Sequence, residues 1–513
     1  MAKFSEQLKR TSSAIGRFFV SVWQTMLLPF FQRVRKFFTP QNLKEVGRRL
    51  HRGKVNPIAL GMIVSFAVVF GISLATLIGT SGAGWSSVLF YNPADFFMDF
   101  FKSMSDSEYS GLYTEWGNIY APIMYIPLNF LLHLIPGYEY MSVEELRNSQ
   151  AGIVMFMILM ILCHLAFVAI LYRAQKGSRA KKVLFIFFIY VSVCMISVIE
   201  RGNVILFALI TTGLFLLLYR ADSWWQREIS YVCLALSVCI KIYPVFFGIL
   251  LLRDKQFTGA IRCAVYWLVL FVAPFLYYGN MAENIIAYFR AVFDFGGVAT
   301  SAVADPGTVW LAAKEAAEEL LEDALEGSSS FGYTGTFQIL FLKLYQNYFT
   351  LTVSEQLSNA LFIVAFIFTF FQDKTWKAAL LLSILSITLS SSTYTYSLAF
   401  LIMPCIMFLN EASWKNPLHW IYAALFVCIF GFFVWEEQYY HVSPYYQYSF
   451  YYCNYANLIE RFAILIMTFL LTCEGVFHAI LRLEDGIVWC IRRKKRMDLR
   501  RKSLAENPYG RKR

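Results

Sequence analysis

Long runs of apolar residues alternate with short polar or charged segments along most of the chain. Pro57 to Gly79 and Phe257 to Tyr278 are two such runs, and each is near the roughly 20 residues that span a bilayer's hydrocarbon core. Backbone polar groups find no water partners there, so runs of this kind must be helical. The strands of a membrane barrel would instead alternate in polarity over about ten residues. The pattern predicts an all-α polytopic membrane protein.

The apolar runs predict about twelve transmembrane helices. They cover residues 57–79, 153–172, 183–199, 204–219, 229–240, 244–252, 257–278, 356–372, 377–390, 395–410, 418–435 and 457–481. The run 244–252 is too short to cross alone, so a bent or broken pair of helices is expected around Lys241-Ile242-Tyr243-Pro244. The proline-punctuated segment Tyr120 to Ile135 is predicted to lie on the outer leaflet as a juxtamembrane helix.

Basic residues gather at both ends of the chain and in alternate loops. The net charge is +11 overall, with +10 in residues 1–54 and +9 in residues 492–513. Lys and Arg favour the cytoplasmic side of a membrane, so both termini are predicted to be cytoplasmic. The loop 173–182 contains five basic residues and is assigned to the inside as well. The basic ends are expected to contact anionic membrane lipids rather than nucleic acid.

This topology divides the chain into three parts. They are a basic cytoplasmic segment (residues 1–56) with an interfacial helix at Phe18 to Phe31, a transmembrane domain (57–481) and a basic cytoplasmic tail (482–513). The outer loops of the transmembrane domain are residues 80–152, 279–355 and 436–455. Residues 281–353 contain nine acidic and three basic residues, as expected of an outer loop, and Val309 to Leu325 is predicted to form a solvated surface helix.

The sequence has no signature of a resident metal, nucleotide or disulfide framework. CxxC, HExxH, EF-hand and Walker motifs are all missing, and the six histidines are scattered singly. Most of the ten cysteines lie inside apolar runs. We therefore predict no metal site and no required cofactor.

Two carboxylates in the first outer loop are candidates for acid–base chemistry. They are Asp95 and Asp99 in Ala94-Asp95-Phe96-Phe97-Met98-Asp99-Phe100-Phe101. On a continuous helix, the i,i+4 spacing would place both on one face. Their mutual repulsion and poor solvation would then raise the pKa of at least one, as a general base requires. The alternative is a pair of acids on the polar face of a surface helix.

Two basic residues near predicted span ends are candidates for binding an anion. Arg201 lies in the turn Glu200-Arg201-Gly202-Asn203, where its planar fork could bind a phosphate or form an ion pair that helps the turn. Lys241 lies between two isoleucines. A charge within the membrane is costly, so it needs an anionic partner from the protein or from a ligand. Extension of the side chain to the headgroups is the alternative.

In order and spacing, four of these segments resemble those of the polytopic C-superfamily glycosyltransferases, and most closely glycosyltransferase family 87. They are Asp95-Phe96-Phe97-Met98-Asp99-Phe100-Phe101, Tyr120-Ala121-Pro122, Glu200-Arg201-Gly202-Asn203 and Lys241-Ile242-Tyr243-Pro244. The resemblance covers roughly residues 57–280. Tyr120-Ala121-Pro122 departs from the double-proline form usual in the family.

The resemblance implies an inverting transfer of a sugar, mannose or another hexose, from a polyprenyl-phosphate donor on the outer face of a bacterial plasma membrane. The acceptor would be an envelope lipid, glycan or protein. Asp99 takes the role of general base, with Asp95 as second choice. Arg201 and Lys241 are the candidates for binding the donor phosphate, and Glu200, Asn203 and Tyr243 are further candidate binding residues. A divalent metal, used in other branches of the superfamily, stays open.

Three other functions remain open on the sequence alone. A transporter or flippase for a lipid-linked sugar would favour charges near the bilayer midplane and internal repeats. A non-catalytic scaffold of an envelope-synthesis complex would use the basic ends as partner sites. A glycan ligase or polymerase would differ in using a pyrophosphate-linked donor.

Overall fold

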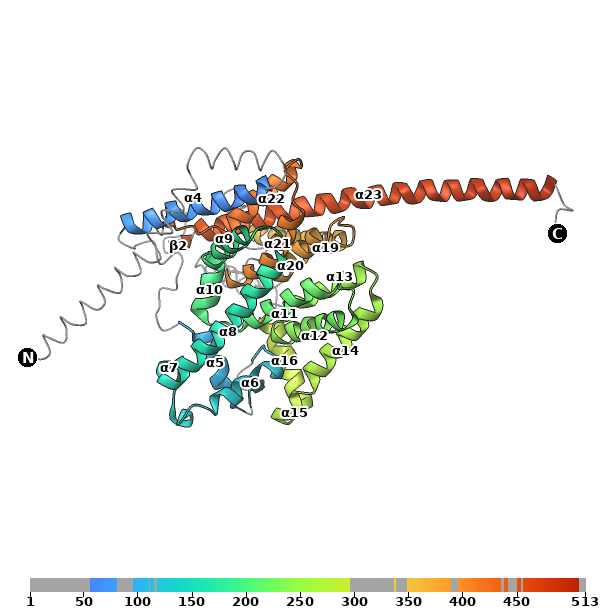
Figure 1. The fold of residues 1–513 in the computed structure, drawn as a ribbon. Helices are drawn as coiled ribbons and strands as arrows, with labels where there is room; N and C mark the ends of the chain where they lie inside the picture. Colours follow the sequence, from blue (N-terminus) through green and yellow to red (C-terminus); the bar gives the residue numbers. More distant parts are fainter. Residues whose placement is uncertain are drawn as a thin grey trace, which may run out of the picture. The chain divides into compact units, whose positions relative to one another are not determined.

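The computed structural model describes residues 56–80, 96–109, 111–114, 118–295, 336–337, 348–388, 395–434, 438–441, 450–453 and 455–506. Apart from one two-stranded hairpin, the regular elements in these ranges are helical (Figure 1), as the hydrophobic pattern predicts. The chain forms two compact units. Of the described residues, 56–61 and 412–419 belong to one unit, and those within 62–411 and 420–506 belong to the other. The second unit contains all the candidate functional residues that the structure describes.

The helices follow one another closely along the chain. The first half contains α4 (Pro57–Gly79), α5 (Met98–Asp106), α6 (Pro122–Leu132), η4 (Tyr138–Tyr140), α7 (Val143–Asn148), α8 (Gln150–Ala174), α9 (Arg179–Tyr190), α10 (Val193–Arg201), α11 (Ile205–Leu218), α12 (Trp224–Ile240), η5 (Tyr243–Phe247) and α13 (Gly248–Arg253). The second half contains α14 (Phe257–Val272), α15 (Phe275–Tyr278), α16 (Met281–Phe295), α19 (Tyr348–Thr369), α20 (Thr375–Thr388), η6 (Thr395–Leu401), α21 (Ile402–Glu411), α22 (Pro417–Phe430) and α23 (Tyr455–Glu506). The antiparallel strands β1 (Gln438–His441) and β2 (Phe450–Cys453) pair Gln438 with Cys453.

Four described helical segments are long and apolar enough to cross a bilayer. They are α4, α8, the segment Phe257–Tyr278 and the segment Leu458–Glu484 of α23. Helices α9 and α10 form a fifth candidate span that is bent by 62°. Every predicted span lies on one helix or on two consecutive helices. Most of the predicted spans beyond these five are apolar helices of 10–17 residues. The chain is therefore a multi-pass membrane protein, while the predicted count of about twelve spans is not confirmed.

The helix break expected around Lys241 is present. Helix α12 ends at Ile240, Lys241 is extended (φ −140°, ψ 132°) and η5 begins at Tyr243. Pro244 has no N–H to bond the carbonyl of Ile240, so the helix cannot continue through it. The break leaves the Lys241 side chain at the end of a buried helix.

Helix α6 is shorter than the thickness of a bilayer core. Its 11 residues extend over about 16 Å, whereas a bilayer core is about 30 Å thick. The assignment of Tyr120 to Ile135 to the outer leaflet stays a prediction. Phe130 and Leu134 are 65% and 59% exposed, which is the kind of apolar face that a juxtamembrane helix turns to lipid.

The helices around Lys241 pack closely. Helix α11 packs against α8 and α12, and α12 packs against α14 (Figure 1). An aromatic cluster ties the chain before α6 to α14, α15 and α16. Its buried rings are Tyr113, Tyr125, Phe271, Phe275 and Tyr288. The first loop is therefore fixed to the end of α12 rather than lying over it as a separate segment.

Several predictions concern residues that the structure does not describe. The interfacial helix at Phe18 to Phe31, the surface helix at Val309 to Leu325 and Asp95 all lie outside the described residues. Helix α23 runs as one helix across the predicted boundary at residue 481. The division into a membrane domain and a tail stays a prediction.

Two left-handed residues hold the start of α5 against the turn between α10 and α11. Phe97 and Gly202 both have φ 59°, and the Phe97 N–H donates to the carbonyl of Glu200 at 2.7 Å. The Phe97 ring lies 4.6 Å from that of Phe156. Phe97 leaves helical geometry to make this contact and α5 begins at Met98, so the condition of a continuous helix through Asp95 and Asp99 is not met at Phe97.

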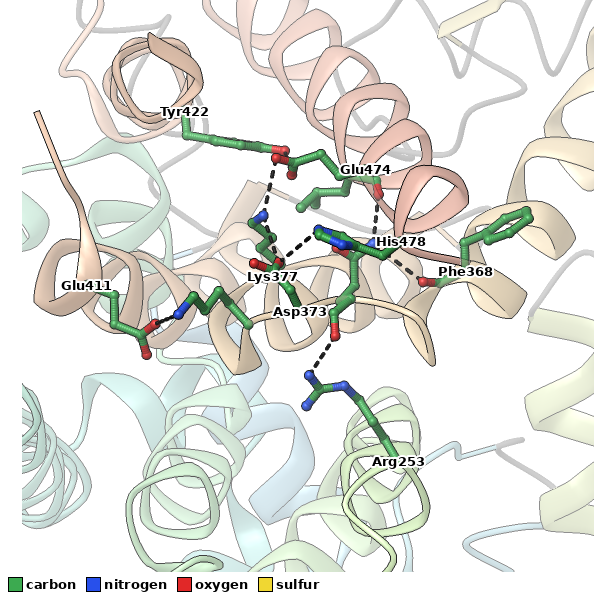
Figure 2. Close-up of polar contacts among 11 residues, drawn as sticks. Arg253, Phe368, Asp373, Lys377, Glu411, Tyr422, Glu474 and His478 are labelled. Carbon is green, nitrogen blue, oxygen red and sulfur yellow. Dashed lines mark hydrogen bonds and ion pairs between the residues drawn. The ribbon is translucent and has the colours of Figure 1, made fainter. Parts of the chain in front are cut away.

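An ion network around the buried Lys377 ties α22 and α23 to the start of α20 (Figure 2). Lys377 Nζ lies 2.8 Å from Asp373 Oδ1 and 3.2 Å from Glu474 Oε1. Tyr422 donates to the other oxygen of Glu474 at 2.8 Å. Burial raises the pKa of the Asp373 carboxyl, but the Lys377 ammonium and His478 outweigh this effect and the pKa lies below its ordinary value. The C-terminal helix is thereby anchored by paired charges.

Replacing Lys377 with Met is expected to lower the free energy of unfolding by about 3–5 kcal/mol, because two carboxylates lose their shared cation. Lys374→Met is the matched control. Its pair with Glu411 is 4.0 Å long and about half exposed, so its loss should cost at most about 1 kcal/mol. Thermal unfolding of both variants in one detergent measures the difference. Equal melting temperatures would contradict the anchoring role.

Replacing Gly202 with Ala is expected to destabilise the protein by about 1–3 kcal/mol, since left-handed geometry is unfavourable for alanine. The added Cβ would also lie 3.0 Å from the Phe156 ring and 3.2 Å from Phe97 Cα. Gly71→Ala in α4 is the control, because nothing lies within 4 Å of the Cβ it would add. The melting temperature should fall only for Gly202→Ala. A fall of the same size in both variants would contradict the role of Gly202 in holding α5 against the turn.

Candidate active site

The carboxylate of Asp99 lies against the turn that follows α10. Asp99 occupies the first turn of α5, and its Oδ1 is 2.9 Å from Arg201 Nη2. Its Oδ2 accepts a short 2.5 Å hydrogen bond from Asn203 Nδ2. The side chains of Asp99 and Arg201 are 18% and 17% exposed. Two separate motifs of the sequence thus meet at one partly exposed carboxylate.

Asn203 joins this carboxylate to the start of α11. Its side-chain oxygen accepts from the Ile205 N–H at 2.8 Å, while its amide nitrogen donates to Asp99. Asn203 itself is only 1% exposed. The side chain therefore has little freedom, and the orientation of the Asp99 carboxylate is fixed by the same residue that begins the next helix.

Lys241 is a buried cation without an acidic partner in the part of the chain that the structure describes. The residue is 6% exposed. Its Nζ donates to Tyr120 Oη at 3.0 Å and lies 4.6 Å and 5.8 Å from the ring centres of Tyr120 and Tyr396. An ammonium carries three donor hydrogens, and these contacts satisfy one of them. The other two hydrogens could be donated to an anion.

Tyr120 connects the two halves of the site. Its hydroxyl accepts from Lys241, and it lies close enough to Asp99, Arg201 and Asn203 to interact with each. Burial raises the pKa of Tyr120 well above its ordinary value, and the Asp99 charge raises it further, whereas Asn203 and Arg201 lower it. The hydroxyl therefore keeps its proton at neutral pH.

Two predicted binding residues take other positions. Glu200 is 4% exposed at the end of α10, and its backbone carbonyl receives the Phe97 N–H. Tyr243 begins η5, and its carbonyl accepts from the Ser386 hydroxyl of α20 at 3.1 Å. Both residues contribute backbone contacts that hold the neighbouring segments in place. The roles of all the predicted site residues as substrate ligands stay predictions.

Two tyrosines of the site were given no role by sequence reasoning. Tyr120 belongs to a recognised segment, but nothing in the pattern indicates that its hydroxyl would meet Lys241. Tyr396 comes from η6, some 155 residues after Lys241 in the chain. Residues so far apart in the sequence leave no local pattern. The sequence alone therefore cannot indicate which of the chain's tyrosines would lie beside Lys241.

The described residues include no group of three or more His, Cys, Asp or Glu side chains that could hold a metal ion. The candidate site contains a carboxylate, Asp99, that is held by an arginine and an amide. It also contains the buried ammonium of Lys241, which has open donor hydrogens. A fixed carboxylate can accept a proton, and a buried ammonium can stabilise a developing negative charge.

Comparison with known proteins identifies a family. The family model described as glycosyltransferase family 87 matches residues 118–404. The match includes Tyr120, Arg201 and Lys241 and begins after Asp99. No curated protein and no solved structure matches the chain. Because the family model covers more than half of the sequence, the chain belongs to glycosyltransferase family 87 and is a membrane glycosyltransferase of the C-superfamily type.

Proposed function

We propose that the protein transfers a hexose, such as mannose, from a polyprenyl phosphate to a hydroxyl of an envelope lipid, glycan or protein, with inversion at the anomeric carbon. The reaction would take place at the outer face of a bacterial plasma membrane, with both termini in the cytoplasm. No cofactor is part of the proposal. The observation that carries it is the buried Lys241 ammonium, whose described partners are one hydroxyl and two aromatic rings.

The two cations of the site have different surroundings, and this suggests different roles. Arg201 forms an ion pair with Asp99, so it would act by orienting the base. Lys241 has no carboxylate partner among the described residues, so it would bind the phosphate of the donor. A phosphate in that position supplies the anion that makes the burial of a lysine tolerable.

In the proposed reaction, Asp99 removes the proton from the acceptor hydroxyl. The acceptor oxygen forms a bond to the anomeric carbon from the face opposite the phosphate. The bond between that carbon and the phosphate oxygen breaks, and its electron pair leaves with the polyprenyl phosphate. The Lys241 ammonium stabilises the charge that develops on the leaving phosphate.

Membership of the family supports an enzyme over the other functions that the sequence leaves open. A transporter for a lipid-linked sugar would move its substrate across vesicles without forming a glycoside. A scaffold would be unaffected by loss of Asp99 and Lys241. A ligase or polymerase would require a pyrophosphate-linked donor, so the donor that is consumed separates it from the proposed reaction.

Asp99→Asn is expected to reduce transfer at least about 100-fold, the usual lower bound for loss of a general base. Transfer is measured on purified protein with labelled polyprenyl-phosphate sugars and a panel of lipid and glycan acceptors. Asp106→Asn is the matched control on the same helix: the Asp106 carboxyl hydrogen bonds with Asn118, and asparagine keeps the size of the side chain and one of its acceptor oxygens. Activity of this control should stay within a few-fold of the unaltered protein.

Asp95→Asn, measured in parallel, decides which carboxylate is the base. Full activity of Asp99→Asn together with loss in Asp95→Asn would transfer the role to Asp95. Full activity of both variants would exclude an aspartate base in this loop.

Lys241→Met is expected to raise the KM for the donor about 10-fold or more, because a hydrogen-bonded contact to a charged group is lost. Lys182→Met is the matched control. Its Nζ lies 4.6 Å from the ring centre of Tyr172 and donates to the Tyr172 carbonyl at 2.9 Å, so it has the same kind of aromatic contact away from the site. A donor KM that rises equally in both variants, or in neither, would rule out a phosphate site at Lys241.

A further inference from the structure

Tyr120 is held rigidly from several sides. Tyr113 donates its hydroxyl to the Tyr120 carbonyl at 2.9 Å, and the next N–H, of Ala121, donates to the Cys239 carbonyl at 3.2 Å. The Tyr120 ring packs 6.0 Å from that of Tyr125. These contacts join the segment before α6 to α12. The position of the hydroxyl is therefore set before any ligand arrives.

The Tyr120 oxygen receives hydrogen bonds from Lys241 and from the Asn203 side chain, and no described group accepts the hydrogen of this hydroxyl. Lysine has only donor hydrogens, so the phenolic oxygen is the acceptor in the 3.0 Å contact with Lys241. The phenol keeps its own hydrogen to donate. No described carbonyl or carboxylate forms a hydrogen bond with it, although buried polar groups are nearly always satisfied.

Three donor hydrogens thus remain close together: one on Tyr120 and two on the buried Lys241. A single anion with several oxygens can accept from both residues at once. Lys241 is only 6% exposed, so little water competes for its hydrogens, which strengthens each such contact. A neutral acceptor would leave the ammonium charge uncompensated.

We propose that the Tyr120 hydroxyl is a second ligand of the anion held by Lys241, and donates a hydrogen bond to a phosphate oxygen of the polyprenyl carrier. The identity of the carrier rests on the proposed function, whereas the anion site itself does not. Tyr120 also adjoins Asn203 and Asp99, so the phosphate would lie on the Lys241 side of the tyrosine and the base on the other.

Tyr120→Phe tests this in the full-length protein in lipid nanodiscs. The variant keeps the ring over Lys241 and removes only the hydroxyl. Binding of a polyprenyl phosphate without sugar is measured beside binding of the corresponding polyprenol. The phosphate should bind about 10-fold or more weakly to the variant, while polyprenol binding stays unchanged. The donor KM should rise as well, with the acceptor KM unaffected.

Tyr125→Phe is the matched control. Its hydroxyl is also buried and donates to Asn118 at 3.0 Å, and it makes no described contact with Lys241. This variant should bind the phosphate like the unaltered protein. Tyr120→Phe that binds the phosphate as tightly as the unaltered protein would overturn the inference.

If Tyr120→Phe does not fold, Lys241→Met serves in its place. With Tyr120 still present, Lys241→Met should keep part of the preference for polyprenyl phosphate over polyprenol, and complete loss of that preference would overturn the inference. Phosphate binding that depends on Tyr120, without transfer from any polyprenyl-phosphate sugar, would reject the proposed function and leave the anion site intact. Transfer from a polyprenyl-phosphate sugar, with phosphate binding that does not depend on Tyr120, would support the proposed function and overturn the inference about Tyr120.

Discussion

The burial of one positive charge is the constraint on which the site depends. An ammonium removed from water loses several kcal/mol of solvation unless a partner replaces it. For Lys241 the described replacements are one hydroxyl and two ring faces, and cation–π contacts offer only about 0.5–2 kcal/mol each. The remaining cost favours any conformation in which an anion enters.

Irregular backbone brings the reactive groups together, while the apolar helices hold it in place. Asp99 follows left-handed Phe97, and Arg201 and Asn203 flank left-handed Gly202. In a membrane protein, non-helical backbone is tolerated where protein or a polar cavity satisfies its N–H and C=O groups. The hydrogen bond from the Phe97 N–H to the Glu200 carbonyl satisfies one such pair of groups. Strain of this kind persists only where the surrounding packing enforces it.

The order of motifs was sufficient to predict that Asp99 and the turn at residues 200–203 serve one site, and the proline explains the break after Lys241. The number of spans was harder, because hydropathy counts apolar residues but not the breaks that shorten helices to 10–17 residues. The left-handed geometry of Phe97 before α5 could not be predicted, since it contradicts the local preference of a phenylalanine. The pairing of Arg201 with Asp99, and of Lys241 with Tyr120, depends on tertiary contacts more than 100 residues apart in sequence, which no periodicity encodes.

Two buried lysines of the molecule differ in their charged partners. Lys377 and Lys241 are 5% and 6% exposed, so both lose nearly the same contact with water. Lys377 receives two carboxylates in the same unit, whereas Lys241 receives none among the described residues. If Lys241 served only the fold, a carboxylate or a long path to solvent would be expected in compensation, as at Lys377. Its described surroundings instead leave donor hydrogens open beside Tyr120. This contrast between two lysines of equal burial is the physical basis of the anion site proposed at Lys241.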